Sequence, residues 1–74
     1  MKSGPFEILI ASPPDREKLV AEVHFRNEQV VEISQDKESL QIEIAAYRTG
    51  VAWRFDFEDF LEALQTAKKH LLGQ

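Results

Sequence analysis

Apolar and polar residues alternate in short runs over the first three quarters of the chain, as the side chains of a half-buried β-strand do. The clearest run is residues 18–26, where Leu19, Ala21, Val23 and Phe25 share one side. Prolines, polar segments and Gly50 separate this run from its neighbours. The pattern predicts strands at roughly residues 6–11, 18–26, 30–35, 39–48 and 51–55.

The last part of the chain has a different period. Apolar residues at three- and four-residue steps predict an amphipathic helix over residues 56–72, and Lys68 is the only polar residue in its apolar stripe. Asp56 suits the N-cap, because its carboxylate can accept a hydrogen bond from a first-turn N–H. Phe55 and Phe60 are spaced as a hydrophobic staple, so this helix start is the best-signalled boundary in the chain.

Together these elements predict an α+β fold: a four- to five-stranded antiparallel β-meander with one C-terminal α-helix packed on one face. Residues 1–74 form one small domain in this interpretation. The face under the helix is expected to carry most of the large apolar side chains: Phe6, Ile8, Ile10, Leu19, Val23, Phe25, Val31, Ile33, Leu40, Ile42, Ile44, Trp53 and Phe55.

Parity restricts how the strands pair, because facing residues must share a face of the sheet. A three-residue loop at 27–29 would place Val23 opposite Ile33, and His24 opposite Glu32 on the other face. For the next hairpin, Ile33 can face either Leu40 or Ile42. The Leu40 register is favoured, because the alternative sets Glu32 directly against Glu43 and like charges repel.

Composition excludes several classes of protein. The chain has 74 residues, no cysteine and a net charge of −4. The acidic balance argues against nucleic acid, whose binding depends on neutralising phosphates. The apolar run after the N-terminus is too short for a signal peptide or a membrane span, so no membrane partner is expected. The absence of cysteine favours a cytoplasmic location.

Candidate chemistry is sparse. Glu22, His24, Glu32 and Glu43 could gather on the uncovered face of the sheet, where a small ligand or a metal cation could bind them. One histidine without a second imidazole or a thiolate is a weak ligand set, and glutamates are common on solvated strands. No nucleophile elbow or glycine-rich phosphate loop occurs. We therefore assign no catalytic, cofactor or metal site and expect a protein that is not an enzyme.

The remaining hypothesis is a small acidic protein–protein interaction module. It would bind itself, as a homodimer, or bind and inhibit a basic partner in the manner of an antitoxin or immunity protein. Binding would use the uncovered sheet face or an edge strand. The alternative is a ligand- or cation-binding domain that uses the same face. The candidate partner-binding residues on that face are Leu9, Val20, Glu22, His24, Val30, Glu32, Glu43, Tyr47 and Arg54.

Overall fold

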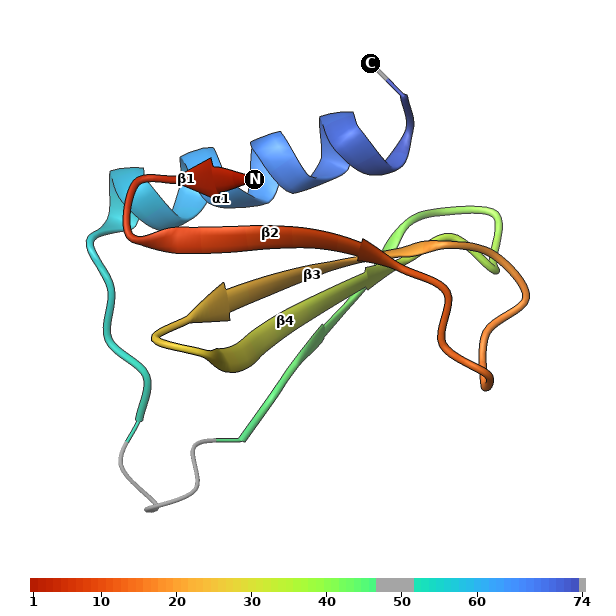
Figure 1. The fold of residues 1–74 in the computed structure, drawn as a ribbon, viewed down its shortest axis with the longest axis horizontal. Helices are drawn as coiled ribbons and strands as arrows, with labels where there is room; N and C mark the ends of the chain where they lie inside the picture. Colours follow the sequence, from red (N-terminus) through yellow and green to blue (C-terminus); the bar gives the residue numbers. More distant parts are fainter. Residues whose placement is uncertain (47–51, 74) are drawn as a thin grey trace.

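A computed structural model describes residues 1–46 and 52–73. The elements are β1 (Lys2–Ser3), β2 (Phe6–Ala11), β3 (Val20–Phe25), β4 (Glu28–Ser34), β5 (Gln41–Ile44) and α1 (Phe57–Leu71). The strands form one antiparallel sheet in the order β1-β2-β3-β4-β5, and α1 packs across one face (Figure 1). The predicted fold, an antiparallel meander with one C-terminal helix, is confirmed.

The fifth strand comes from the opposite end of the chain from the one predicted. Residues 52–55 form no strand, although Trp53 and Phe55 are partly buried there. The alternation in this segment reflects packing against the core without strand pairing. The fifth strand is instead β1, which returns to β2 through Gly4 at φ 57°, a conformation that glycine adopts readily. Position 51 of the predicted strand lies outside the described residues.

The turn between β3 and β4 is shorter than predicted. Arg26 and Asn27 have φ values of 50° and 67°, and two consecutive positive φ values are typical of a two-residue type I′ hairpin turn. The three-residue loop is therefore wrong. The register changes with it, because Val23 pairs with Val31 and not with Ile33.

A β-bulge in β4 places one side chain on the face opposite the one predicted. His24 pairs with Gln29 and Val23 pairs with Val31, which leaves Val30 as an extra residue on β4. Val30 was predicted on the uncovered face, but it is buried in the core at 1% exposure. Strict alternation fails at such a bulge, because two consecutive residues oppose one residue of the partner strand.

The hairpin between β4 and β5 takes the register that the sequence disfavoured. Ile33 pairs with Ile42, and Glu32 faces Glu43. Arg16, from the connection between β2 and β3, offsets the repulsion. Its Nε donates to Glu32 Oε2 at 2.9 Å, and its Nη2 lies 3.3 Å from Glu43 Oε1. A cation from a distant segment thus stabilises two facing carboxylates.

The core lies between the sheet and α1, which packs against β1, β2 and β3. Ala63, Ala67 and Leu71 are the buried residues of the helix. Phe6 is the largest fully buried side chain, and an aromatic cluster surrounds it with ring centroids 5.0–5.6 Å away. The rings packed against Phe6 are those of Phe25, Phe55 and Phe60.

The boundaries of α1 follow their sequence signals. The Asp56 carboxylate accepts a hydrogen bond from the Asp59 N–H at 3.1 Å, so Asp56 is the N-cap as predicted. Glu58 and Asp59 lie in the first turn and Lys68 in the last, which complements the helix dipole. In the part of the chain that the structure describes, no helix has the length and apolar character needed to cross a membrane.

Candidate functional site

The sheet face opposite α1 is partly covered by residues 12–19, which we call the β2–β3 strap. The strap is fastened to β4 and β5 by the Arg16 contacts with Glu32 and Glu43. The end of the strap is bound to the segment after β4, where the Asp36 carboxylate accepts hydrogen bonds from the backbone N–H groups of Glu17 and Lys18 at 3.3 and 3.1 Å. The contacts of Arg16 engage Glu32 and Glu43, which the sequence analysis had proposed as partner-binding residues.

Two of the ionisable groups on this face have shifted pKa values. The hydrogen bond to Glu32 raises the pKa of the Arg16 guanidinium. The N-terminal ammonium lies 2.7 Å from Glu7 Oε2. Its hydrogen bond lowers the pKa of the Glu7 carboxyl, because a hydrogen bond to the carboxylate favours the charged form.

The predicted ligand or metal cluster is present only in part. Glu22 faces Glu32 across the sheet and Glu32 faces Glu43, while His24 Nε2 lies 3.0 Å from Glu22 Oε1. Arg16 contacts two of these carboxylates. Across residues 1–46 and 52–73, no group of three or more histidine, aspartate or glutamate side chains is arranged to hold a metal ion.

The other candidate residues do not lie together on one surface. Leu9 is exposed on the face opposite α1, at 43%. Val20, which follows the strap, is fully buried, and Val30 points into the core instead. Arg54 is exposed on the segment before α1 and belongs to no strand. Tyr47 lies outside the described residues.

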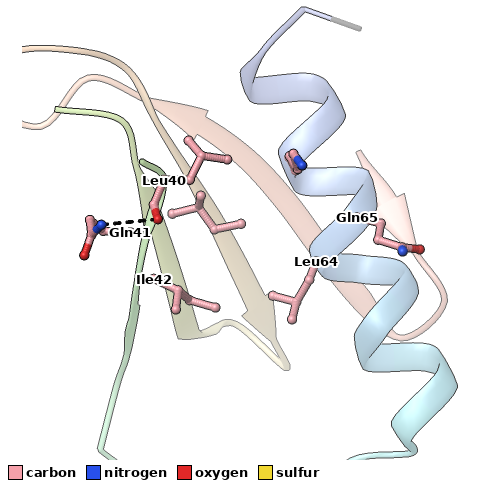
Figure 2. Close-up of a pocket in the computed structure, with 7 residues that line it drawn as sticks. Leu40, Gln41, Ile42, Leu64 and Gln65 are labelled. Atoms are coloured by element: carbon pink, nitrogen blue, oxygen red, sulfur yellow. Dashed lines mark hydrogen bonds between the residues drawn. The ribbon is translucent and has the colours of Figure 1, made fainter. Parts of the chain in front are cut away.

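The most distinctive surface feature lies on the other face, between α1 and β5. A cavity of about 220 Å³ is lined there by Leu40 and Ile42 on one side and by Leu64 and Lys68 on the other, above Ile33. Figure 2 shows Ile42 and Leu64 pointing toward each other across the gap, while Gln65 turns aside. The lining is almost wholly apolar.

A second cavity lies nearer the beginning of α1. It has a volume of about 280 Å³ and lies among Ile44, Trp53, Phe55, Phe57 and Phe60, with Val30 also in its lining. The Trp53 indole N–H donates to the Ala45 carbonyl at 3.2 Å, and this hydrogen bond links the segment before α1 to the residue that follows β5. We call the two cavities together the α1–β5 groove.

The groove leaves large apolar side chains in contact with solvent. Ile42 is 51% exposed, Ile44 64% and Phe57 72%. Single exposed apolar residues are ordinary, but a contiguous patch marks an interaction surface. Ile42 lines the first cavity, and Ile44 and Phe57 line the second, so these side chains form a patch along the two cavities.

Strand β5 also presents its backbone. It is the edge strand of the sheet that the described residues form. The Ala45 N–H donates to the Val30 carbonyl at 2.8 Å, and hydrogen-bonded pairs alternate with non-hydrogen-bonded pairs in an antiparallel ladder. The N–H and C=O groups of Ile42 and Ile44 therefore point away from β4, along the open edge.

The sequence placed Ile42 and Ile44 on the correct face but assumed that α1 would cover them. One helix is about 10 Å across and strands are about 4.8 Å apart, so a single helix cannot cover five strands. A five-stranded sheet with one helix must leave part of that face open. Comparing the width of one helix with the width of five strands would have located the uncovered part of this face.

Comparisons of this chain with family models, with curated proteins and with solved structures found no match. The arrangement of the side chains is therefore the basis for a function.

Proposed function

We propose that this protein is a non-enzymatic protein–protein interaction module whose docking surface is the α1–β5 groove. The observation that carries the proposal is the pair of apolar walls, formed by Ile42 and Ile44 on β5 and by Phe57, Phe60 and Leu64 on α1. Covering such side chains gains about 25 cal/mol for each Å² of apolar surface removed from water. A partner that fills the groove would gain this free energy.

The proposal moves the binding surface away from the face that the sequence favoured. On that face Arg16, Glu32 and Glu43 are engaged with one another, and Glu22 lies against His24. A partner there would have to displace contacts that already exist. In the groove, a partner would displace only water from apolar side chains, so docking there costs less.

Charge and composition refine the kind of partner. With a net charge of −4, the protein attracts a basic partner at long range, which raises the association rate more than it raises affinity. The lack of cysteine fits a reducing compartment, and we place the interaction in the cytoplasm. The partner in this proposal is a protein and not a nucleic acid or a membrane.

The test is partner capture with three matched versions of the chain, made in the cell that normally produces it. The groove version carries Ile42→Ser and Ile44→Ser. The control carries Leu9→Ser on the opposite face, where Leu9 is exposed to a similar degree. All three should fold, because substitutions at exposed positions usually change stability by less than about 0.5 kcal/mol.

We expect a protein that co-purifies with the wild type and with the Leu9→Ser control but not with the groove version. Quantitative mass spectrometry of the captured proteins measures this difference. The proposal is wrong if the same proteins are captured by all three versions, or if only the Leu9→Ser substitution removes them. Sedimentation velocity of the purified chain shows whether the captured partner is a second copy.

A further inference from the structure

The two edges of the sheet are protected to different degrees. β1 forms one edge and has only two residues, one of which is Lys2, and Gly4 and Pro5 follow it directly. Short strands, lysine and proline are means by which proteins prevent an edge from pairing with another chain. β5 forms the other edge (Figure 1), has four residues and contains neither lysine nor proline. The edge of β5 therefore lacks these protections.

The single charge on β5 is already partly neutralised. Glu43 is the only ionisable residue of the strand, and an edge carboxylate discourages pairing when it meets another carboxylate. The Arg16 Nη2 atom lies 3.3 Å from Glu43 Oε1, which reduces that repulsion. The Glu43 side chain also remains 75% exposed, so a polar group of another strand has access to it.

β5 offers the backbone groups that pairing needs. The N–H and C=O groups of Glu43 and Ala45 point toward β4, as the hydrogen bond from the Ala45 N–H to the Val30 carbonyl indicates. The N–H and C=O groups of Ile42 and Ile44 therefore point outward, and the side chains of these two residues are more than half exposed. A strand added at this edge would form hydrogen bonds and cover apolar surface at the same time.

The helix layer leaves room for an added strand. In the part of the chain that the structure describes, α1 packs against β1, β2 and β3, toward the opposite edge of the sheet. The Gln41 amide donates to Ser39 Oγ at 3.0 Å, and both residues are exposed. This local contact costs little to exchange, because water or another strand can replace it.

A second copy of this chain can supply the added strand, because β5 is complementary to itself in one register. The outward groups of one strand must meet the outward groups of the other, so even-numbered residues must pair with even-numbered residues. Two antiparallel registers satisfy this rule and pair three of the four β5 residues with β5 residues of the second copy. One is centred on Ile42 and the other on Glu43.

Charge distinguishes the two registers. The register centred on Glu43 places Glu43 directly opposite its own copy, and facing like charges destabilise a strand pair. The register centred on Ile42 places Glu43 opposite Gln41 of the second copy, whose amide can donate to the carboxylate. On the other face of the sheet, Ile42 then lies opposite its own copy and Ile44 lies opposite Leu40. Both faces are therefore complementary in the register centred on Ile42.

We infer that the protein forms a homodimer in which β5 pairs antiparallel with β5 of a second copy, centred on Ile42. Two five-stranded sheets become one continuous sheet in this dimer. The inference goes beyond the proposed function and does not rest on it, because it uses the edge of β5 and leaves Phe57 and Leu64 on the helix wall uncovered. The paired segment is short beside the roughly 1,200–2,000 Å² that stable interfaces bury, so the dimer should dissociate on dilution.

The first test removes one outward donor. Sedimentation velocity of the full chain from about 10 μM to about 1 mM measures the dissociation constant of the dimer. Ile42→Pro removes the N–H at the centre of the pairing and leaves the hydrogen bonds to β4 in place, because this N–H points outward. Ile42→Ala is the matched control, because it shortens the side chain and keeps the N–H. Ile42→Pro should remove the dimer, whereas Ile42→Ala should retain it at lower affinity.

The second test reads the register through charge. Gln41→Lys places a cation opposite Glu43 of the second copy, twice in each dimer, and should tighten the dimer about threefold to tenfold. Gln41→Glu should weaken it by a similar factor. Gln29→Lys is the control, because it makes the same change in net charge at an exposed position of β4, inside the sheet. It should have a smaller effect than Gln41→Lys, and added salt should reduce the difference between the two Gln41 variants.

NMR identifies the facing residues directly. In a mixture of isoleucine-methyl-labelled and leucine-methyl-labelled chains, the register centred on Ile42 predicts a nuclear Overhauser effect between Ile44 and Leu40. Within one chain these residues lie four positions apart on an extended segment, about 13 Å, so such a signal comes from two copies. The register centred on Glu43 would instead bring Ile44 against Ile42.

Four results would overturn the inference: a monomer at every concentration, a dimer that folded Ile42→Pro retains, equal affinities for Gln41→Lys and Gln41→Glu, or contact of Ile44 with Ile42 in place of Leu40. If Ile42→Pro does not fold, the two Gln41 variants decide. The proposed function fails or stands separately. Capture of another protein through the groove by a chain that stays monomeric would support the groove and overturn the dimer, and a dimer without a groove-dependent partner would do the reverse.

Discussion

On the sheet face that carries α1, the two halves of the sheet present similar side chains in opposite environments. Phe6 and Val23, on β2 and β3, lie under α1 and are fully buried. Ile42 and Ile44, on the edge strand β5, are more than half exposed. The strands alternate in the same way on both sides, so the difference comes from where the helix lies.

This contrast shows what a covering helix decides. Alternation in a strand specifies which side chains share a face, but it does not specify whether that face is covered. Coverage depends on the position of α1, which the buried residues Ala63 and Ala67 allow to approach the sheet closely. Apolar residues beyond the reach of the helix then become available to another molecule.

The largest expected effect compares two phenylalanines, one on each side. Phe6→Ala removes the central ring of the aromatic cluster and should cost about 3–5 kcal/mol in the free energy of unfolding, which would leave a domain of this size barely folded. Phe57→Ala removes a ring that is 72% exposed, and its effect should be below about 0.5 kcal/mol. Urea titration followed by circular dichroism measures both. Similar losses for the two variants would mean that Phe57 is part of the core and that the groove is already filled.

The same contrast holds between neighbouring strands. Ile33 on β4 is 6% exposed and Ile44 on β5 is 64% exposed. Ile33→Ala should cost about 2–4 kcal/mol because it leaves a cavity, whereas Ile44→Ala should change the free energy of unfolding by less than about 0.5 kcal/mol. Urea titration again reports the cost. An Ile44→Ala loss as large as that of Ile33→Ala would contradict an open β5.

Much of the fold follows from local sequence signals. Asp56 is flanked by a strand-like segment and a run of helical period, and its side chain caps α1 as predicted. The strands β2 and β3 lie within their predicted ranges because strict alternation has few alternative explanations, whereas β4 begins at Glu28, two residues before its predicted start. β5 is shorter than predicted, and its predicted range extends into residues outside those described.

What the sequence did not reveal depended on distant contacts. The register of β5 could not be obtained from Glu32 and Glu43 alone, because Arg16 is 16 positions from Glu32 and 27 from Glu43. The two-residue turn depends on positive φ values at Arg26 and Asn27, which the residue types permit but do not require, and the bulge at Val30 then returns Val31 and Ile33 to the core face. For the candidate site, pattern assigned Ile42 and Ile44 to a face, whereas only the position of α1 shows that they are uncovered.

The smallest expected effect concerns how β5 is held on its opposite face. The inner side chains of β5 lie in the open groove, so β5 depends on its pairing with β4 and on the Arg16 bridge from Glu32 to Glu43. Arg16→Met keeps most of the aliphatic stem and removes the charge, which leaves two facing carboxylates without their shared cation. We expect a lower urea midpoint than for the wild type, with a smaller loss than for Ile33→Ala, and faster amide exchange in β5 than in β3.

Glu43→Gln provides the control for this bridge. In the Arg16→Met background it removes the repulsion between Glu32 and Glu43, so the double variant should recover part of the lost midpoint. Added salt should have a similar effect, because it screens the repulsion at the exposed Glu43 more than at buried sites. If Glu43→Gln lowers the midpoint further in that background, charge repulsion is not the reason that β5 needs Arg16. In that event the aliphatic stem of Arg16 stabilises β5 through packing, and the charge of its guanidinium does not.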